Sequence, residues 1–238
     1  MTRFVLFPKK ANADQKAIIS SNILFYKNLN KHFKTIFEHR VLKFIEHHKF
    51  IGREGVEVTE KMKLLIASTA VMLTFGMRRF LFSKFESIII YPKSYLSTVT
   101  KNQHRGETNP RYKVIVFSWD NFMDGINKEE DNINLGLHEL THALHLGFLQ
   151  HKSFTAIVFL DYFRALLDQM RDVKLQRKIV DSGYLRQYAF KNKYEFLSVI
   201  VEHYFESPIE FNEKLPEVYK MVRKMLNLDI IHVGTKVF

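Results

Sequence analysis

The stretch LHELTHALH, residues 137–145, decides how this sequence is interpreted. It holds His138, Glu139 and His142 in the pattern His-Glu-x-x-His, on a segment whose apolar spacing predicts a helix. A helix advances ~100° per residue, so the two histidines lie ~40° apart on one face. Two imidazoles placed in this way can bind one zinc ion, while Glu139 faces the position left for water. The pattern predicts a hydrolytic zinc site, and a buried helix with hydrogen-bonded histidines is the alternative.

A third protein ligand must come from elsewhere in the chain. Catalytic zinc normally takes three protein ligands and keeps a fourth position for water. The chain has no cysteine, so only nitrogen and oxygen ligands are available. The downstream candidates are His145, His151, Asp161, Glu195, Glu202 and His203. One class of zinc peptidase uses a glutamate on a second helix, and Glu195, 53 residues after His142, fits that role, although spacing alone leaves the others open. Glu202, on the same predicted helix face as Glu195, could orient a ligand histidine.

The composition is that of a globular chain with a full core. Of 238 residues, 46% are hydrophobic and 22 are phenylalanine, which we interpret as core filling in a single domain spanning residues 1–238. No apolar stretch reaches the ~20 residues that span a bilayer. The longest, residues 64–77, is interpreted as a buried core helix. We therefore expect a cytoplasmic protein that does not associate with membranes.

Periodicity predicts an α+β fold that is predominantly helical. The expected helices cover residues 13–29, 32–48, 59–75, 133–148, 154–173, 193–205 and 216–226. Two short segments rich in β-branched and aromatic residues, Ser87–Tyr91 and Tyr112–Trp119, are expected strands. The polar stretch between them, residues 96–111, is interpreted as a loop or an irregular hairpin. The expected architecture is a small sheet beside the His-Glu-x-x-His helix, with the edge of Tyr112–Trp119 free to pair with an extended peptide.

The charge is unevenly distributed. The net charge is +11, and residues 1–125 carry all of it, with 21 basic and 10 acidic side chains, while residues 126–238 carry 15 of each. Such an excess could attract nucleic acid or an acidic partner, or could simply be a solvated surface. No helix-turn-helix, zinc-finger or similar pattern accompanies it, so specific nucleic-acid binding is not expected.

Several blocks of sequence together resemble one family. In order, they are FYKNLNKHFKTIFEHRVLKFI, FIGREGVEVTEKMKLLIASTAVMLTFG, SIIIYPKSY, VIVFSWDNFMDG, NLGLHELTHALH and YAFKNKYEFLSVIVEHYFESP. Their order and spacing over most of the chain resemble the Mlc titration factor A (MtfA) family of zinc-dependent peptidases. That family is similar to the catalytic domain of anthrax lethal factor, a zincin in which His-Glu-x-x-His pairs with a distant glutamate. The resemblance implies a zincin-like fold and one Zn²⁺ per chain.

The resemblance also implies roles for individual residues. It makes His138 and His142 zinc ligands, Glu139 the general base and Glu195 the third ligand. It places a functional tyrosine seven residues before that glutamate, where Tyr188 stands. A tyrosine hydroxyl near the metal can donate a hydrogen bond to the developing oxyanion of peptide hydrolysis. The implied activity is that of an aminopeptidase-like zinc peptidase acting on short peptides.

Two points of the resemblance leave alternatives open. The family usually has an acidic residue where this chain has His145, which could contact the site or be a hydrogen-bonded histidine at the helix end. The family is named for sequestering a transcriptional repressor of glucose uptake. A regulatory binding protein that sequesters such a repressor, with the peptidase site secondary, is therefore the alternative function.

Overall fold

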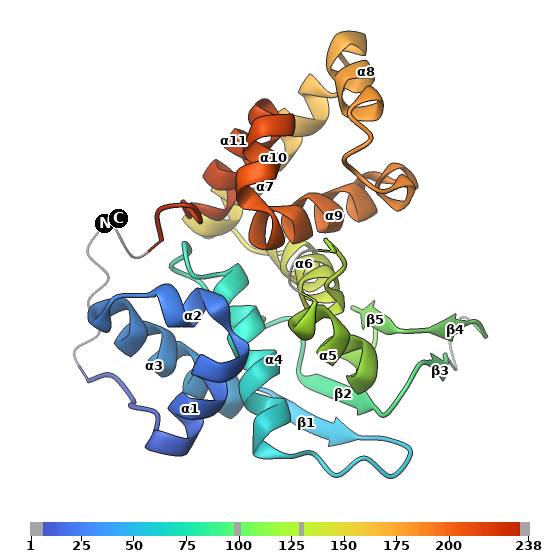
Figure 1. Ribbon diagram of the computed structural model, residues 1–238. Helices are drawn as coiled ribbons and strands as arrows, with labels where there is room; N and C mark the ends of the chain where they lie inside the picture. The colour runs from blue at the N-terminus through green and yellow to red at the C-terminus, as the bar shows by residue number, and fades with distance from the viewer. Residues whose placement is uncertain (1–6, 98–100, 129–130, 234–238) are drawn as a thin grey trace.

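A buried helix, α4 (Glu60–Leu73), forms the centre of the N-terminal half. In this computed structural model, which describes residues 7–97, 101–128 and 131–233, every residue from Leu64 to Val71 is buried. Helices α1 (Ala13–Asn22) and α3 (Lys31–His47) pack on one side of it, with α2 (Leu24–Asn28) beside them (Figure 1). The helix expected over residues 13–29 is broken at Ile23, whose extended backbone separates α1 from α2 while its side chain stays buried.

A four-stranded sheet lies against these helices. Its strands are β1 (Lys49–Gly52), β2 (Ser87–Tyr91), β6 (Val114–Ser118) and β5 (Gly106–Asn109), in that order across the sheet. The first three run parallel, and β5 is antiparallel to β6. Because strand side chains alternate, Ile88, Ile90, Ile115 and Phe117 fill the core on one face, all with no exposed surface.

The edge strand is not the one that the sequence analysis predicted. The expected strand 112–119 begins two residues later, as β6, and it lies between β2 and β5, so it has no free edge. The edge strands are β1 and β5, and β5 lies inside the stretch interpreted as a loop or an irregular hairpin. The same stretch begins within β3 (Tyr95–Leu96) and contains β4 (Gln103–His104), which pair as a two-stranded sheet. Its residues 98–100 lie outside the described part of the chain.

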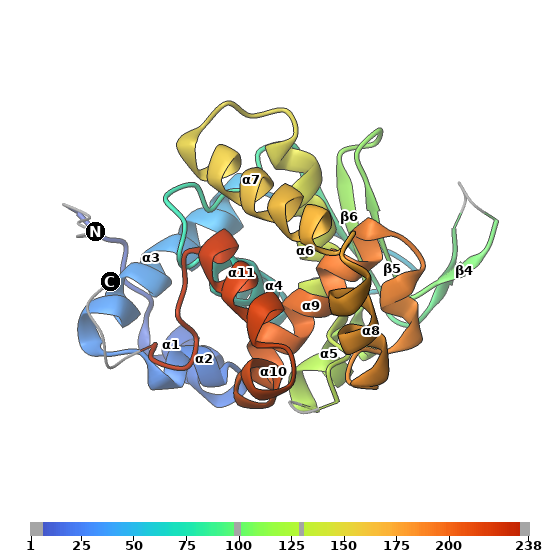
Figure 2. The same ribbon diagram turned by 90° about the horizontal axis from the view of Figure 1, so that it is seen from above.

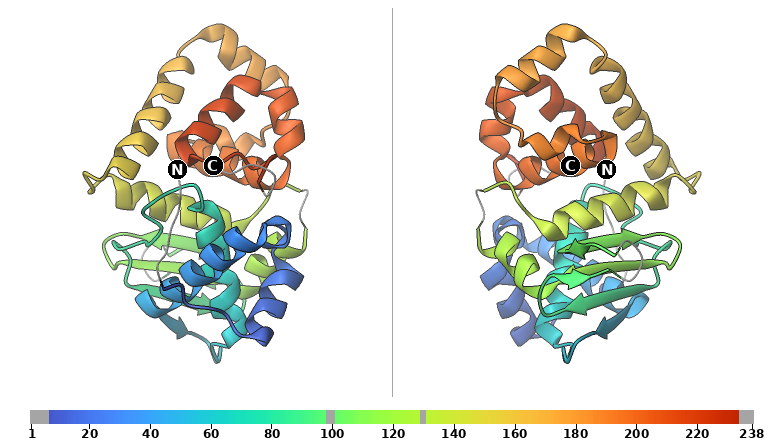
Figure 3. Two further views of the ribbon diagram at one scale, coloured as in Figure 1. Left: turned by 90° about the vertical axis from the view of Figure 1, so that its left-hand side faces the viewer. Right: turned by 90° about the vertical axis from the view of Figure 1, so that its right-hand side faces the viewer.

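The C-terminal half is helical and lies beyond α6 (Leu135–Phe148). Figures 1 and 3 show α6 between the sheet on one side and a second group of helices on the other. Figure 2 shows this group from above. It comprises α7 (Phe154–Gln169), α8 (Val173–Asp181), the 3-10 helix η1 (Gln187–Phe190), α9 (Lys193–Glu206), α10 (Pro208–Lys214) and α11 (Pro216–Leu226). A short helix, α5 (Trp119–Asn127), follows β6 directly and precedes α6. Helix α6 therefore contacts both halves of the molecule, packing on α4 and β5 as well as on α9 and α7.

The predicted fold class is confirmed. The molecule is predominantly helical with a small sheet beside the His-Glu-x-x-His helix, which is consistent with a zincin-like metallopeptidase domain. The phenylalanines do fill the core, and those with almost no exposed surface include Phe37, Phe75, Phe117 and Phe159. Within residues 7–97, 101–128 and 131–233, no helix is both long and apolar enough to cross a bilayer.

Candidate metal centre

Two helices bring three potential metal ligands together. Helix α6 is capped at its N-terminus by Asn134, whose side chain accepts a hydrogen bond from the backbone N–H of Leu137. Helix α9 is capped by Asn192, whose side chain accepts from the N–H groups of Tyr194 and Glu195. Glu195 thus lies in the first turn of α9, where a carboxylate is favoured by the helix dipole. The two helices pack against each other, so this turn faces the histidines of α6.

The ligand atoms of these three residues converge on one point. The Nε2 atoms of His138 and His142 are 3.2 Å apart. The Oε2 atom of Glu195 lies 3.0 Å from the first and 3.3 Å from the second. One nitrogen or oxygen atom from each residue lies within 4.8 Å of the others. Two imidazoles and a carboxylate aimed at a common centre are a donor set that suits zinc, so the residues present fit this metal.

The electrostatics of the cluster favour a cation. Burial alone would lower the pKa of His138, but hydrogen bonds to the carboxylates of Glu195 and Glu202 outweigh it and raise that pKa to about 10. Burial opposes ionisation of Glu195 as well, yet the two histidines hold its pKa far below the usual range. Two carboxylates therefore flank His138, one at each ring nitrogen, and they stabilise a positive charge on its ring.

A second layer of polar groups orients His138. The Oε1 atom of Glu202 lies 2.7 Å from His138 Nδ1, so Nε2 is the nitrogen turned toward the cluster. Glu202 is 1% exposed and is itself held by the Arg186 guanidinium at 2.7 Å and by the backbone N–H of Asn134 at 2.8 Å. The predicted orienting contact of Glu202 with a histidine is thus present. Ser198 completes this layer by donating to the carbonyl oxygen of His138.

Strand β5 holds Glu139 in place. The hydroxyl of Thr108 lies 2.9 Å from Glu139 Oε2 and also 2.9 Å from its backbone oxygen. Gly106 permits this close approach of strand to helix, because a Cβ at this position would lie 2.8 Å from both Glu139 Cγ and Leu135 Cδ1. Glu139, 7% exposed, therefore has a fixed carboxylate beside the cluster.

Tyr188 lies at the mouth of the site. It belongs to η1, its ring centroid is 5.9 Å from that of His138, and 44% of its surface is exposed. Partial burial and the neighbouring Glu195 carboxylate raise its pKa to about 12. The phenol therefore stays protonated at neutral pH, and a hydrogen bond to the Glu195 carboxylate contributes to the shift.

A cleft of about 670 Å³ opens in front of these residues. Its lining includes His138, Glu139 and Tyr188, together with residues of β4, β5 and α5. A cleft of this size can admit several residues of a peptide or a small molecule.

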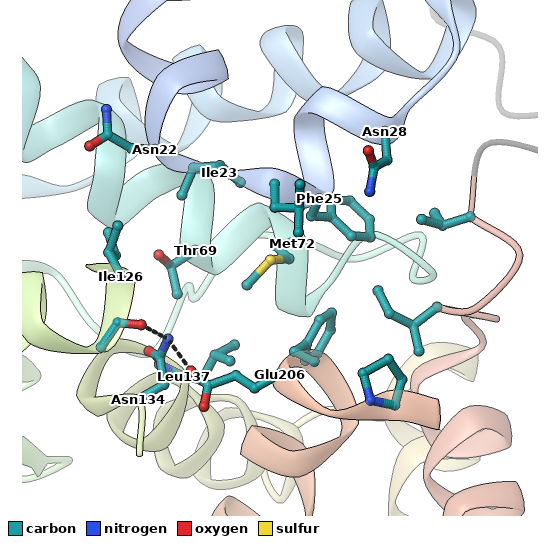
Figure 4. A pocket seen from close by; sticks show the side chains of 16 residues that line it. Asn22, Ile23, Phe25, Asn28, Thr69, Met72, Ile126, Asn134, Leu137 and Glu206 are labelled. Atoms are coloured by element: carbon teal, nitrogen blue, oxygen red, sulfur yellow. Dashed lines mark hydrogen bonds between the residues drawn. The ribbon is translucent and has the colours of Figure 1, made fainter. Parts of the chain in front are cut away.

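A smaller cavity of about 250 Å³ lies between the two halves of the molecule, and the second polar layer extends to it (Figure 4). Asn134, whose backbone N–H donates to Glu202, donates from its side chain to the carbonyl oxygen of Gly125 and to Glu206 Oε1. Burial raises the pKa of Glu206 to about 8, and its second oxygen has no partner within the described part of the chain. The start of α6 is thereby connected with a buried carboxyl group.

The other candidate ligands do not join the cluster. His145 is buried against the rings of Phe163 and Tyr194, and burial lowers its pKa to about 4. His145 is thus buried near the end of its helix, and the hydrogen bond that the alternative assumed stays a prediction. The remaining three are also occupied elsewhere: His151 with Arg79, exposed Asp161 with Arg164, and buried His203 against Tyr184.

Sequence reasoning missed several residues that shape the site. Arg186, Asn134, Thr108 and Gly106 each act through a contact that is remote in sequence, for example 31 residues between Thr108 and Glu139. Asn134 alone carried a local signal, because an asparagine just before an apolar helix is a typical N-cap.

Comparisons with known proteins agree with this geometry. The chain is similar to an uncharacterized protein of Synechocystis sp., with 21% identity over 246 residues that cover 94% of this chain and 87% of the relative. The family model of the glucose-regulated metallo-peptidases M90 matches residues 3–226. This match spans nearly the whole chain and includes both helices that form the cluster. The chain therefore belongs to the glucose-regulated metallo-peptidase family M90.

Proposed function

We propose that the protein is a zinc-dependent peptidase that hydrolyses peptide bonds in the cleft beside α6. The observation that carries this proposal is the convergence of His138, His142 and Glu195 on one point, with the carboxylate of Glu139 fixed next to it. Membership of a metallopeptidase family supports the reaction class. In this proposal the three converging residues hold one Zn²⁺, which would polarise the scissile carbonyl and acidify a water molecule.

Each of the surrounding residues has a task in this mechanism. Glu139 accepts the proton of the attacking water and delivers it to the leaving amine. The bond from Thr108 engages one carboxylate oxygen of Glu139, and the other oxygen remains free to accept the proton. Tyr188 donates a hydrogen bond to the carbonyl oxygen of the scissile peptide as negative charge develops on it. Glu202 and Arg186 keep the His138 ring in the orientation that turns Nε2 toward the cluster.

Strand β5 offers a place for the substrate backbone. It is an edge strand of the sheet, with β6 as its only strand neighbour in the described part of the chain, and it is the edge that adjoins α6. An extended peptide can add to such an edge through main-chain hydrogen bonds, which aligns a substrate without reading its sequence. This role replaces the one that the sequence analysis gave to the edge of residues 112–119.

The direct test is peptide hydrolysis with and without zinc. Purified protein is incubated with a mixture of short peptides, and cleavage is followed by mass spectrometry before chelation, after chelation and after zinc is restored. We expect cleavage to stop on chelation and to return with zinc. Glu139→Gln should bind zinc and cleave nothing, whereas Glu210→Gln, at an exposed glutamate of α10, should behave as the wild type. Cleavage that survives both chelation and Glu139→Gln would refute the proposal.

Aminopeptidase-like specificity is a further part of the proposal, and it rests on the sequence resemblance. It is tested by comparing peptides with free and acetylated amino termini. Removal of single residues from the free peptides alone is the expected result, and internal cleavage of both sets would show an endopeptidase instead.

A further inference from the structure

A second pocket lies on the face of the sheet that points away from the core. It encloses about 250 Å³ and is lined by alternate residues of β2, β6 and β5 and by the start of the β3–β4 hairpin. Strand alternation explains its composition: Gly106 and Thr108 of β5 face α6, so Glu107 and Asn109 face this pocket. The register pairs Glu107 with Val116, whose side chain also lines the pocket.

The chemistry of the pocket is that of a cation site. Its one charged group is the carboxylate of Glu107, which accepts hydrogen bonds from Ser97 and Asn109, each at 2.9 Å. No lysine or arginine among the described residues forms an ion pair with it. Three tyrosines, Tyr91, Tyr95 and Tyr112, line the same space, and the ring of Tyr112 already has the Arg111 guanidinium 5.9 Å from its centroid. Aromatic rings and a carboxylate without a basic partner favour an ammonium or guanidinium group over any anion.

The Tyr95 side chain supplies an independent sign that a polar partner is missing. It is 5% exposed and its ring stacks on that of Tyr91, with centroids 4.1 Å apart. Its hydroxyl is buried and has no hydrogen-bond partner within the described residues. Buried hydroxyl groups are normally paired, because an unpaired one costs free energy. The Tyr95 side chain lines the pocket, while its hydroxyl oxygen lies beneath the surface, so the group that a ligand in the pocket would meet first is the Glu107 carboxylate.

The pocket lies beside the strand on which a substrate would be aligned. A peptide added to the free edge of β5 extends the sheet, so its side chains alternate between the cleft face and the pocket face. Every second side chain of such a peptide therefore passes next to Glu107 and Asn109. We propose that this pocket binds the basic side chain of a lysine or arginine in a peptide aligned on β5, and this inference rests on the proposed peptidase function. The volume equals that of about eight water molecules at ~30 Å³ each, enough for a long side chain.

The test compares peptides that differ at one position. A substrate is synthesised with lysine, norleucine or glutamate at each position in turn around the cleaved bond. Norleucine has the four-carbon stem of lysine without the charged amino group. At one position, or at positions two residues apart, we expect kcat/KM for lysine to exceed that for norleucine by about tenfold, since hydrogen bonds to charged groups are the stronger kind. Glutamate should be disfavoured there. The lysine preference should weaken as salt is added, because screening shortens the range of the charge.

Variants then assign the preference to the pocket. Glu107→Gln keeps the shape; its amide oxygen can accept from Asn109, and its NH2 group can donate to the Ser97 hydroxyl, which is both donor and acceptor. The lysine-to-norleucine ratio should fall from about ten to about one. Tyr112→Ala removes a side chain that is 59% exposed, so the fold is not at risk, and it should reduce the ratio in part. Glu213→Gln, at an exposed glutamate of α10, should leave the ratio unchanged. A ratio that persists in Glu107→Gln would overturn the inference.

Binding measurements separate this inference from the proposed function. Calorimetry with the Glu139→Gln protein gives the dissociation constants of the lysine and norleucine peptides without cleavage. One outcome is that the wild-type protein cleaves no peptide, yet the lysine peptide binds about tenfold more tightly than the norleucine peptide and this difference requires Glu107. In that case the peptidase proposal fails and the pocket assignment stands. If peptides are cleaved and bound with no preference for lysine, the pocket assignment is wrong and the peptidase proposal stands.

Discussion

Replacing Glu202 by glutamine should weaken metal binding without touching any proposed ligand. Glu202 Oε1 lies 2.7 Å from both His138 Nδ1 and Arg186 Nη2, and Oε2 accepts from the Asn134 N–H at 2.8 Å. Glutamine has one acceptor oxygen, so its amide group must face either Asn134 or the pair formed by His138 and Arg186. In either arrangement the glutamine NH2 group faces another hydrogen-bond donor. The position is 1% exposed, so water cannot relieve this contact.

The size of the effect follows from these contacts. Loss of a carboxylate that orients a ligand histidine typically costs 10- to 100-fold in metal affinity, or about 1.4–2.8 kcal/mol. Arg186 also loses its counter-charge. Removing one partner of a buried ion pair costs about 3–5 kcal/mol of folding stability, and we expect about 2–3 kcal/mol because the Arg186 side chain is 27% exposed.

The assay is a zinc titration against a competing chelator, with thermal unfolding measured on the same samples. Arg186→Met should cost less zinc affinity than Glu202→Gln, because it leaves the Glu202–His138 contact in place. Glu210→Gln, at an exposed glutamate, is the matched control. A zinc dissociation constant for Glu202→Gln within twofold of the wild-type value would refute the role of Glu202 as the group that orients His138.

Three further predictions concern the residues around the cluster. Tyr188→Phe should lower kcat by roughly 10²–10³ with zinc content unchanged, as when one oxyanion donor is removed, and normal turnover would make Tyr188 a packing residue. Gly106→Ala should lower kcat by about 10- to 100-fold, because its Cβ would meet Glu139 Cγ at 2.8 Å and displace the general base; unchanged kinetics would contradict this. Burial raises the pKa of Glu206 from 4.5 to about 8, so the folded protein binds this proton more tightly than the unfolded chain does. The stability of the folded state should therefore fall as the pH rises from about 4.5 to about 8. Chemical denaturation should show that the free energy of unfolding of the wild type is lower at pH 8.5 than at pH 6 by an amount on the order of 2 kcal/mol. Glu206→Gln should not show this decrease.

The sequence predicted the elements that carry strong periodicity. Helix α6 and the strand Ser87–Tyr91 have the expected limits or nearly so. The apolar residues of the first recur with the period of a helix, and the second is a short run of β-branched residues, so each pattern is visible in the sequence. Residues 106–109, by contrast, read Gly-Glu-Thr-Asn and show no apolar alternation. They form β5 because β6 pairs with them and Thr108 reaches Glu139, contacts that depend on tertiary structure. Propensity alone does not predict an edge strand of this kind.

Some residues of the candidate site could also be predicted from the sequence, and others depend on tertiary contacts. The spacing of His138 and His142 on one helix was readable from the sequence, and the structure brings Glu195 to them as the resemblance implied. Arg186 was not predicted, because an arginine 16 residues before Glu202 has no local pattern that marks it as a partner. Tyr188 was predicted only through the resemblance, and its contact with the His138 ring arises from the packing of η1 on α9. The roles of these residues in metal binding and catalysis stay predictions.

The central claim is that α6 and α9 together hold one catalytic zinc ion. It is tested most directly by measuring the metal content of purified protein, wild type and His138→Ala/His142→Ala, by elemental mass spectrometry after dialysis. The account predicts about one zinc per chain in the wild type and in Glu139→Gln, and none in the double variant. Full zinc occupancy in the double variant, or no zinc retained by the wild type after zinc loading, would contradict it.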